Sequence, residues 1–401
     1  MTPSTPRVVE VRTHVLKVRH ADAYLGALAD GSELLDEDGY RVREPWRSLY
    51  SARFETLLVE VVADDGTSGW GEALAPVGPE VVEAAVRYLL APQLVGRDAT
   101  APRPAYAALR ALMRERGHLV GHHADALAAL DIAMWDLAGR VLGVPVHVLL
   151  GGAVRDHVPT YLSGLPRPDD AGRADLAAQW RARGVELVKV HLGYGVEADL
   201  ATVDAIQAAT PDLQVAVDAH WVYDLGGARR LARGLAERGA VFLEAPMAPE
   251  DLEGHARLAG TAELPIAVGE ALRNRYEFAA WLRLGAVGLA QPDVARSGIT
   301  ETWAIAELAS AHHVPVALHH SVGLAPSQAA GVHLSAAIED CPFLEYQPAT
   351  AEVAAGLLDS PPEGGPTGYP LPTGTGLGID IDVDAVRALA EDRPAIREDT
   401  V

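Results

Sequence analysis

Three acidic residues close three short apolar runs at equal spacing. Asp218 ends the run VAVD, Glu244 ends VFLE and Glu270 ends PIAVGE, and each lies 26 residues from the next. Each interval holds a turn signal and a helix-like stretch, which is the rhythm of successive strand–helix units in a parallel barrel. The carboxyl ends of neighbouring strands lie side by side in such a barrel, so we expect the three carboxylates to converge at its mouth.

Converging carboxylates repel one another unless a cation lies between them. All-oxygen ligation suits Mg²⁺, so we expect Asp218, Glu244 and Glu270 to bind one Mg²⁺ per subunit. The alternative is three solvated acids that happen to end strands. An acid directly after an apolar strand faces the barrel mouth, where catalysis takes place, and this favours the metal site.

The same alternation extends from about residue 156 to residue 345. Eight strands alternating with amphipathic stretches predict an α/β fold with a closed (β/α)₈ barrel of the TIM type. The eight expected strand ends are Ser163, His191, His220, Glu244, Glu270, Asp293, His320 and Glu345.

The residues on either side of the barrel divide the chain into three parts. Residues 1–126 contain two strand-like runs, a hairpin-type turn and several helix-like stretches, and they predict an α+β N-terminal capping domain. Residues 127–345 would form the barrel. Residues 346–401 begin with a Pro/Gly-rich crossing segment and would return to the cap. Within the cap, the segment 19–50 is long for a connection, which predicts a functional loop or lid.

Composition limits the partners of this chain. Its formal net charge of −22 disfavours nucleic acid and anionic membranes, whereas a small acidic substrate remains possible because a metal can invert the local field. No apolar run is long enough to span a bilayer, and the first residues lack the pattern of a signal peptide. The single cysteine, Cys341, suits a reducing compartment. We expect a cytoplasmic homo-oligomer that acts on a small molecule.

Lysine is rare in this sequence. Of 33 basic residues only Lys17 and Lys189 are lysines. Arginine keeps its proton in proteins whereas the pKa of a buried lysine can be tuned, so a lysine inside the strand-like run GVELVKVHLG indicates chemistry. Lys189 and His191 alternate along that strand and should both point into the barrel.

Several motifs together resemble the enolase superfamily and, within it, the mandelate racemase subgroup. The resemblance covers nearly the whole chain and implies a cap over the barrel mouth, a Mg²⁺ site, and removal of the proton next to a carboxylate to give an enediolate. The motifs are ALDIAMWDLAGRVLGVPVHVLLGG at 129–152, the three acids above, LAQPD at 289–293, VALHHSVG at 316–323, FLEYQP at 343–348 and GLGIDID at 376–382.

The resemblance assigns roles on one side of the site. The subgroup usually has Lys-x-Lys where this chain has Lys189 and His191. Lys189 fits the first position, which lowers its neighbour's pKa and contacts the substrate carboxylate. His191 is then either a base or only a hydrogen-bonding group. Glu345 matches the acid that hydrogen-bonds the substrate carboxylate, for which it must be protonated, and burial among anions would favour that state.

Asp293 resembles the aspartate of the family's Asp–His dyad, in which a carboxylate orients an imidazole and raises its basicity. Two adjacent histidines could be its partner. Counting along the sequence, including the 25-residue step to Glu345, favours His320 and would leave His319 pointing away to pack.

His220 follows Asp218 by two residues and should face the same cavity. Asp-x-His at this strand end resembles the acid-sugar dehydratases of the subgroup, such as galactonate and mannonate dehydratases, in which this histidine transfers a proton. The alternative is a histidine that only supports its neighbours.

The function expected from the sequence is therefore a Mg²⁺-dependent acid-sugar dehydratase, which removes the C2 proton and expels the 3-hydroxyl to give a 2-keto-3-deoxy acid. A racemase or epimerase would use the same enediolate, and a catalytically silent binding barrel is a third alternative. His220 favours dehydration because a departing hydroxide needs an acid. The cap segment should supply substrate contacts, with candidates His20, Tyr24, Arg43, Trp46, Arg47 and Tyr50.

Overall fold

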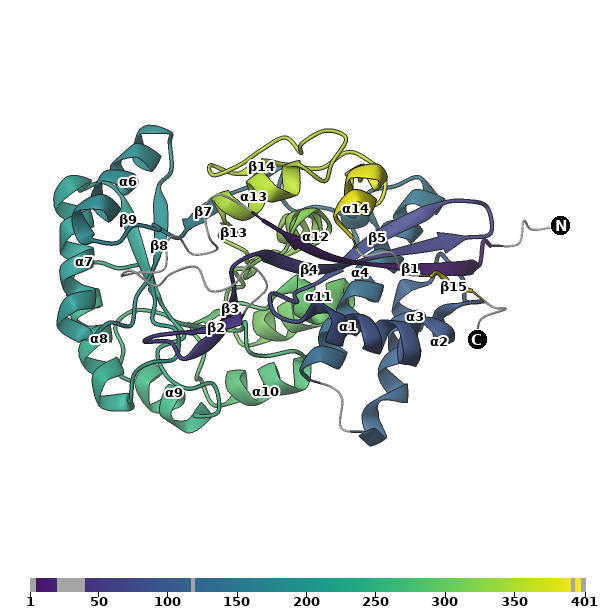
Figure 1. The fold of residues 1–401 in the computed structure, drawn as a ribbon. Helices are drawn as coiled ribbons and strands as arrows, with labels where there is room; N and C mark the ends of the chain where they lie inside the picture. The colour runs from purple at the N-terminus through teal and green to yellow at the C-terminus, as the bar shows by residue number, and fades with distance from the viewer. Residues whose placement is uncertain (1–4, 20–39, 117–119, 391–393, 398–401) are drawn as a thin grey trace.

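The structure is a computed structural model of the chain, and it describes residues 5–19, 40–116, 120–390 and 394–397. Figure 1 shows two parts, a cap built from the purple and blue N-terminal elements and a barrel built from the teal and green elements. This is the α/β architecture that the sequence predicts.

The cap is built on a four-stranded antiparallel sheet. Its strand order is β15-β1-β4-β5, so a strand from the C-terminal end of the chain pairs with the first strand. Helices pack against this sheet. The strands are β1 (Val8–Val18), β4 (Phe54–Ala63), β5 (Ser68–Ala73) and β15 (Ile396–Arg397), and the helical segments are α1 (Pro79–Ala85), the π-helical turn η1 (Val86–Leu90), α2 (Ala91–Leu94), α3 (Pro102–Leu112), η2 (Arg114–Arg116) and α4 (His122–Leu142).

Helix α4 joins the cap to the barrel. It is buried along most of its length and ends at Gly143, which adopts the left-handed conformation with φ of 70° that favours glycine. Glycines on β5 let the helix lie directly on the strand, because a Cβ at Gly71 would come within 2.0 Å of the Ala129 carbonyl oxygen. The helix runs without a break across residue 126, so the expected boundary between cap and barrel stays a prediction.

The barrel contains a seven-stranded parallel sheet of order β12-β11-β10-β9-β8-β7-β13. The segment 316–319 fills the eighth position, because it bridges in parallel to Ala290 and Asp293 on one side and the Leu318 carbonyl accepts from the Glu345 amide on the other. The strands are β7 (Thr160–Ser163), β8 (Leu187–His191), β9 (Gln214–Asp218), β10 (Leu243–Glu244), β11 (Ile266–Val268), β12 (Leu289–Ala290) and β13 (Leu344–Tyr346).

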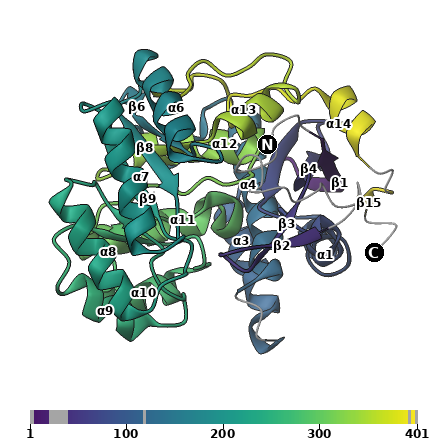
Figure 2. The ribbon, with the colours of Figure 1, turned by 60° about the vertical axis from the view of Figure 1, so that its left-hand side comes forward.

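Helices follow the strands and cover the outside of the barrel (Figures 1 and 2). They are α5 (Val146–Leu149), α6 (Asp170–Ala182), α7 (Val196–Ala209), α8 (Leu225–Glu237), α9 (Leu252–Ala259), α10 (Arg275–Arg283), α11 (Val294–Ala311), α12 (Ala325–Ala337) and α13 (Pro348–Ala355). The last helix, α14 (Val383–Leu389), packs against β1 of the cap instead. A small antiparallel pair joins β6 (His157–Val158) to β14 (Tyr369–Pro370).

A hairpin of the cap reaches the barrel mouth. Strands β2 (Tyr40–Arg43) and β3 (Ser48–Ser51) pair in antiparallel fashion, and the turn between them carries Trp46. The Trp46 indole Nε1 donates to the Leu192 carbonyl at 2.6 Å, just beyond the end of β8. The predicted lid segment therefore contains a structured hairpin that touches the site, while its residues 20–39 lie outside the described part of the chain.

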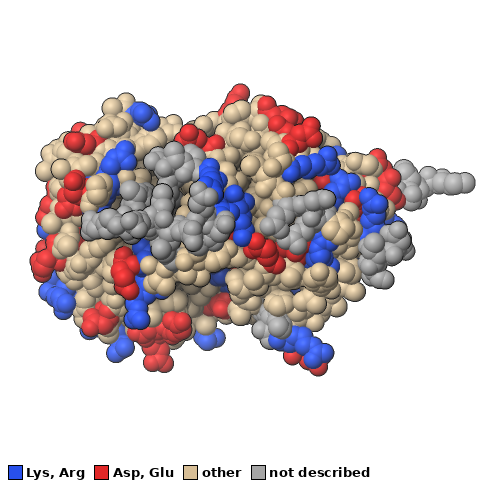
Figure 3. Space-filling view, in the orientation of Figure 1, with Lys and Arg blue, Asp and Glu red and all other residues tan. Residues whose placement is uncertain are grey.

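The surface carries both signs of charge. Figure 3 shows acidic and basic side chains interspersed over the face seen in Figure 1. Within the described residues, no helix combines the length and apolar character that crossing a membrane requires. The single cysteine, Cys341, is a buried thiol.

Candidate active site

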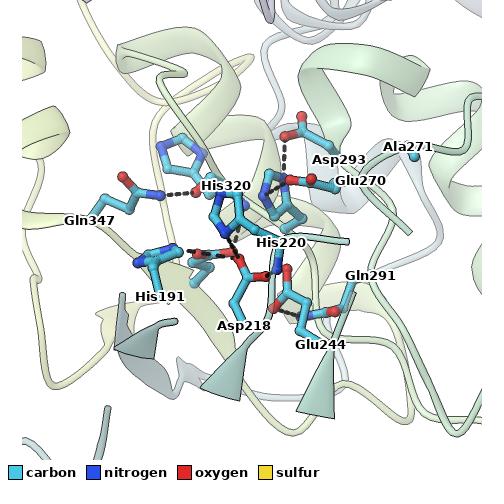
Figure 4. A network of polar contacts seen from close by, with 12 residues as sticks. His191, Asp218, His220, Glu244, Glu270, Ala271, Gln291, Asp293, His320 and Gln347 are labelled. Atoms are coloured by element: carbon cyan, nitrogen blue, oxygen red, sulfur yellow. Dashed lines mark hydrogen bonds and ion pairs between the residues drawn. The ribbon is translucent and has the colours of Figure 1, made fainter. Parts of the chain in front are cut away.

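The predicted acids gather where the barrel strands end (Figure 4). Asp218 and Glu244 end adjacent strands and are register partners, and His191 is the register partner of Asp218 on the other side. Glu270 lies two residues beyond β11, and Asp293 is the N-cap of α11. The parallel register therefore brings together side chains that are far apart in sequence.

Lys189 lies at the centre of this cluster. Its side chain is fully buried, and its Nζ lies 2.8 Å from Glu244 Oε2 and 2.8 Å from Glu345 Oε1. Burial alone would lower the pKa of Lys189, but these carboxylates raise it well above its usual value. Lys189 is therefore a fixed ammonium that compensates two buried acids.

The expectation for Glu345 is wrong in one respect. We expected burial among anions to keep this carboxyl protonated. Burial does push its pKa upward, but Lys189 and His319 outweigh that effect and lower the pKa to about 2. Glu345 is therefore an ionised carboxylate, because its nearest charged neighbours are cations.

The pairing expected between Asp293 and His320 is also wrong. His319 is the partner, with its Nδ1 2.7 Å from Asp293 Oδ2. The reason is register: Asp293 and His319 bridge each other directly in the parallel barrel. The next residue, His320, is held through its backbone: its amide donates to Glu345 Oε2. Its carbonyl accepts from Gln347 Nε2 (Figure 4).

His319 bridges two carboxylates. Its second nitrogen, Nε2, lies 2.9 Å from Glu270 Oε2. Burial opposes the charged ring, but Glu345, Asp293 and Glu270 together raise the pKa of His319 well above its usual value. The ring is thus held through both of its nitrogens.

Two more histidines lie beside Asp218. His220 Nδ1 lies 3.3 Å from Asp218 Oδ2, and the His220 amide donates to Asp218 Oδ1 at 2.9 Å. Burial opposes protonation of His220, but Asp218 raises its pKa overall. His191 Nε2 is farther from the same carboxylate, at 3.7 Å, and burial lowers the pKa of His191 to about 3. His220 is therefore suited to donate a proton, whereas His191 is a weak base suited to hydrogen bonding.

Trp46 of the cap packs on His220. The two rings are stacked with centroids 4.0 Å apart and an interplanar angle of 15°. The guanidinium carbon of Arg43 lies 4.2 Å from the centroid of the Trp46 ring. The centroid of the Tyr50 ring lies 6.0 Å from that of Trp46. The cap hairpin thus forms one wall of the site.

One further cap candidate, Arg47, does not contribute its side chain to this wall. Arg47 is exposed on the same turn, and its backbone has the unusual φ of 55°. His20 and Tyr24 lie outside the described residues. Any contact of these three residues with a substrate therefore stays a prediction.

The donor groups fit a divalent cation. Glu244, Glu270 and His319 each place one ligand atom within 4.8 Å of the others. Lys189 and Gln291 both donate to the same Glu244 oxygen, Oε2, so Oε1 is the oxygen that can turn toward a cation. Asp218 lies outside this close group, so the set of three carboxylates stays a prediction.

Two site residues were missed by sequence reasoning. Gln291 Nε2 donates to Glu244 Oε2 at 2.9 Å, and Trp221 Nε1 donates to Glu270 Oε1 at 3.2 Å. Gln291 lies two residues before Asp293 in LAQPD, so its position in that motif was the available signal. Trp221 offered none, since its left-handed backbone with φ of 64° breaks the alternation of the strand.

The chain is similar to known proteins over most of its length. Residues 172–386 match the family described as enolase C-terminal domain-like, and residues 41–151 match the N-terminal domain of mandelate racemase / muconate lactonizing enzyme. D-galactarolactone cycloisomerase from Agrobacterium fabrum is 35% identical over 70% of this chain and 75% of its own length. D-galactonate dehydratase from Ralstonia nicotianae is 37% identical over 67% of this chain and 72% of its own length.

Solved structures share the whole architecture. A member of the enolase superfamily from Agrobacterium tumefaciens superposes with a TM-score of 0.91 and 33% identity, covering 97% of this chain and all of that one. The 3,6-anhydro-D-galactonate cycloisomerase from Zobellia galactanivorans gives a TM-score of 0.82 and 26% identity, covering 96% of this chain and all of that one.

The contrast between the two adjacent histidines predicts a difference in titration. In the metal-free protein, His319 should keep its proton to a higher pH than an ordinary histidine, because carboxylates hold both of its nitrogens. His320 should stay neutral, because burial lowers its pKa. Nitrogen-15 NMR of the histidine rings checks this, and Asp293→Asn should lower the His319 pKa. A neutral His319 beside a charged His320 at neutral pH would contradict the assignment.

Proposed function

Because the chain belongs to the enolase superfamily, we propose that it is a Mg²⁺-dependent acid-sugar dehydratase. It would remove the C2 proton of an aldonate or aldarate and expel the 3-hydroxyl, giving a 2-keto-3-deoxy acid. One observation carries the proposal. An imidazole oriented by a carboxylate, His319 on Asp293, and a second imidazole with a raised pKa, His220, border one cluster of strand-end carboxylates.

The first chemical task is to remove a very weakly acidic proton. Asp293 fixes the His319 ring through Nδ1. Once Nε2 is released by Glu270 and has lost its proton, that nitrogen would take the proton from C2. Asp218, Glu244 and Glu270 would hold Mg²⁺, which supplies positive charge next to the substrate carboxylate. Lys189 adds a fixed ammonium in the same cluster, and this favours the negative charge that develops on the substrate.

The second task is to let a poor leaving group depart. Hydroxide leaves readily only when a placed acid protonates it. His220 suits this role because Asp218 holds its ring and raises its pKa, and Trp46 stacks on the ring and fixes its plane. His191 would contribute a hydrogen bond to the substrate.

A specific observation favours a second candidate function, an isomerase. One relative is named a D-galactarolactone cycloisomerase, and one structural neighbour is a 3,6-anhydro-D-galactonate cycloisomerase. The same base and the same cation would serve the first step of either reaction. The two candidates differ in the second step, which either loses the 3-hydroxyl as water or gives an isomer with the same atoms as the substrate.

A substrate screen separates the two candidates. The protein is incubated with Mg²⁺ and a library of aldonates, aldarates and aldarolactones, and 2-keto acids are trapped with semicarbazide while proton NMR follows the carbon skeleton. A dehydratase yields a semicarbazone with loss of water. An isomer without loss of water favours the second candidate, and no change in any compound contradicts both.

The metal prediction concerns the three acids. Calorimetry should detect one Mg²⁺ per subunit, EDTA should abolish turnover, and added Mg²⁺ should restore it. Glu244→Gln should weaken Mg²⁺ binding and turnover together, because an amide is a poorer ligand than a carboxylate. Glu253→Gln, which removes one exposed charge on α9, is the matched control. Full Mg²⁺ affinity in Glu244→Gln would refute this site.

The acid prediction concerns His220. His220→Asn should lower the dehydration rate by about 10²–10⁴-fold, the usual contribution of a placed general acid. Exchange of the C2 proton with D₂O should persist, because exchange needs only the base and the cation. His312→Asn, on the exposed end of α11, is the control. Dehydration at the unmodified rate in His220→Asn would refute the assignment of His220 as the acid.

A further inference from the structure

A buried carboxylate of the cap enters the barrel side of the molecule. Glu72 lies on β5 and is 0% exposed. Its Oε1 accepts hydrogen bonds from the Leu324 amide at 2.6 Å and from Thr56 Oγ1 at 2.8 Å. Its Oε2 accepts from the Ser327 amide at 3.1 Å and from Ser327 Oγ at 2.8 Å. Three of these four bonds cross from the cap to residues about 250 positions later in the chain.

These bonds end at the start of helix α12. The first amides of a helix have no partner within the helix, and a negative charge there is stabilised by the helix dipole. The N-cap residue of α12 is Leu324, whose side chain cannot accept a hydrogen bond, and Pro326 follows at the first turn. Glu72 therefore replaces the missing cap from another domain. Burial raises the pKa of Glu72 to about 7, and the donors around it oppose that rise.

The start of α12 is connected to the catalytic base by a short turn. His319 and His320 lie only a few residues before Leu324. At its upstream end the turn is held by Glu345, which accepts from the His320 amide, and by Gln347, which donates to the His320 carbonyl. At its downstream end it is held by Glu72. Gly323 packs tightly inside it, since a Cβ there would come within 3.0 Å of His320 Cε1.

We propose that Glu72 is a positioning residue, through which the cap holds the 320–324 turn and thereby keeps His319 in register with Asp293. The base is then correctly placed only when the cap is seated on the barrel. This inference rests on the proposed function, because it assigns Glu72 a part in placing the base of that reaction.

The chain offers a matched control. Asp136 on α4 is also 0% exposed and also accepts two backbone amides, from Trp70 at 2.8 Å and from Leu377 at 2.7 Å. It forms an ion pair with Arg140 as well. None of these partners belongs to the turn after His319, so Asp136→Asn removes a comparable buried carboxylate without touching that turn.

The experiment compares Glu72→Gln with Asp136→Asn in the full-length protein with Mg²⁺. Both should lower the melting temperature. Only Glu72→Gln should lower kcat per folded molecule, by about 10- to 100-fold, since displacements of about 1 Å at a reacting group have that effect. Its primary isotope effect with C2-deuterated substrate should increase, because proton removal becomes more rate-limiting. Backbone hydrogen exchange should also accelerate in peptides that cover 319–328.

Equal kcat, equal isotope effects and equal exchange in the two variants would overturn the inference. If Glu72→Gln does not fold, Ser327→Ala serves in its place, because it removes only the Oγ donor to Glu72. Its effects on kcat, on the isotope effect and on hydrogen exchange should have the same direction and be smaller. If the unmodified protein acts on no acid sugar, the proposed function fails first. Hydrogen exchange then still decides whether Glu72 holds the turn, because it needs no substrate.

Discussion

The rest of the site depends on how buried negative charge is compensated at the mouth of the barrel. Parallel strands bring five acids to one place, and burying them without partners would be unfavourable. Lys189 lies between Glu244 and Glu345, His319 lies between Asp293 and Glu270, and Asp218 holds His220. Each acid thus has a cationic or protonatable partner, and each of these partners is a group that the proposed reaction uses.

The cap contributes to the site through its own buried acids as well as through its hairpin. Asp125 on α4 accepts from Arg273 Nε at 3.0 Å, and Arg273 in turn donates to the Glu270 carbonyl. Asp131 on the same helix accepts from the Thr300 amide at 2.7 Å, just after the bend of α11 at Gly298. The loop that follows Glu270 and the helix that follows Asp293 are therefore both held from the cap side. The barrel carries the acids and histidines of the site, and contacts from the cap hold the segments that follow two of them in place.

Sequence reasoning succeeded where regular strand geometry governs position. Alternation along β8 predicted that Lys189 and His191 point to the same side, because a strand repeats every two residues, and both reach the cluster of acids. Asp218 ends β9, as its place after an apolar run predicted. The prediction failed at His319 because Asp293 lies beyond the end of β12 and the eighth barrel segment is irregular. Counting a fixed step from Glu345 along such a segment gave His320, which is one residue too far. The charge of Glu345 could not be read from the sequence either, since it depends on Lys189 and His319, which reach it only in the folded barrel. The stacking of Trp46 on His220 joins residues from two domains, and no local pattern indicates such a contact.

The central claim is that His319, held by Asp293, takes the proton from C2. The most direct measurement is exchange of the C2 proton of an accepted acid sugar in D₂O with Mg²⁺, followed by proton NMR for the unmodified protein and for His319→Asn and His320→Asn. The account predicts that exchange is lost in His319→Asn and is retained in His320→Asn. Retained exchange in His319→Asn together with loss in His320→Asn would contradict it.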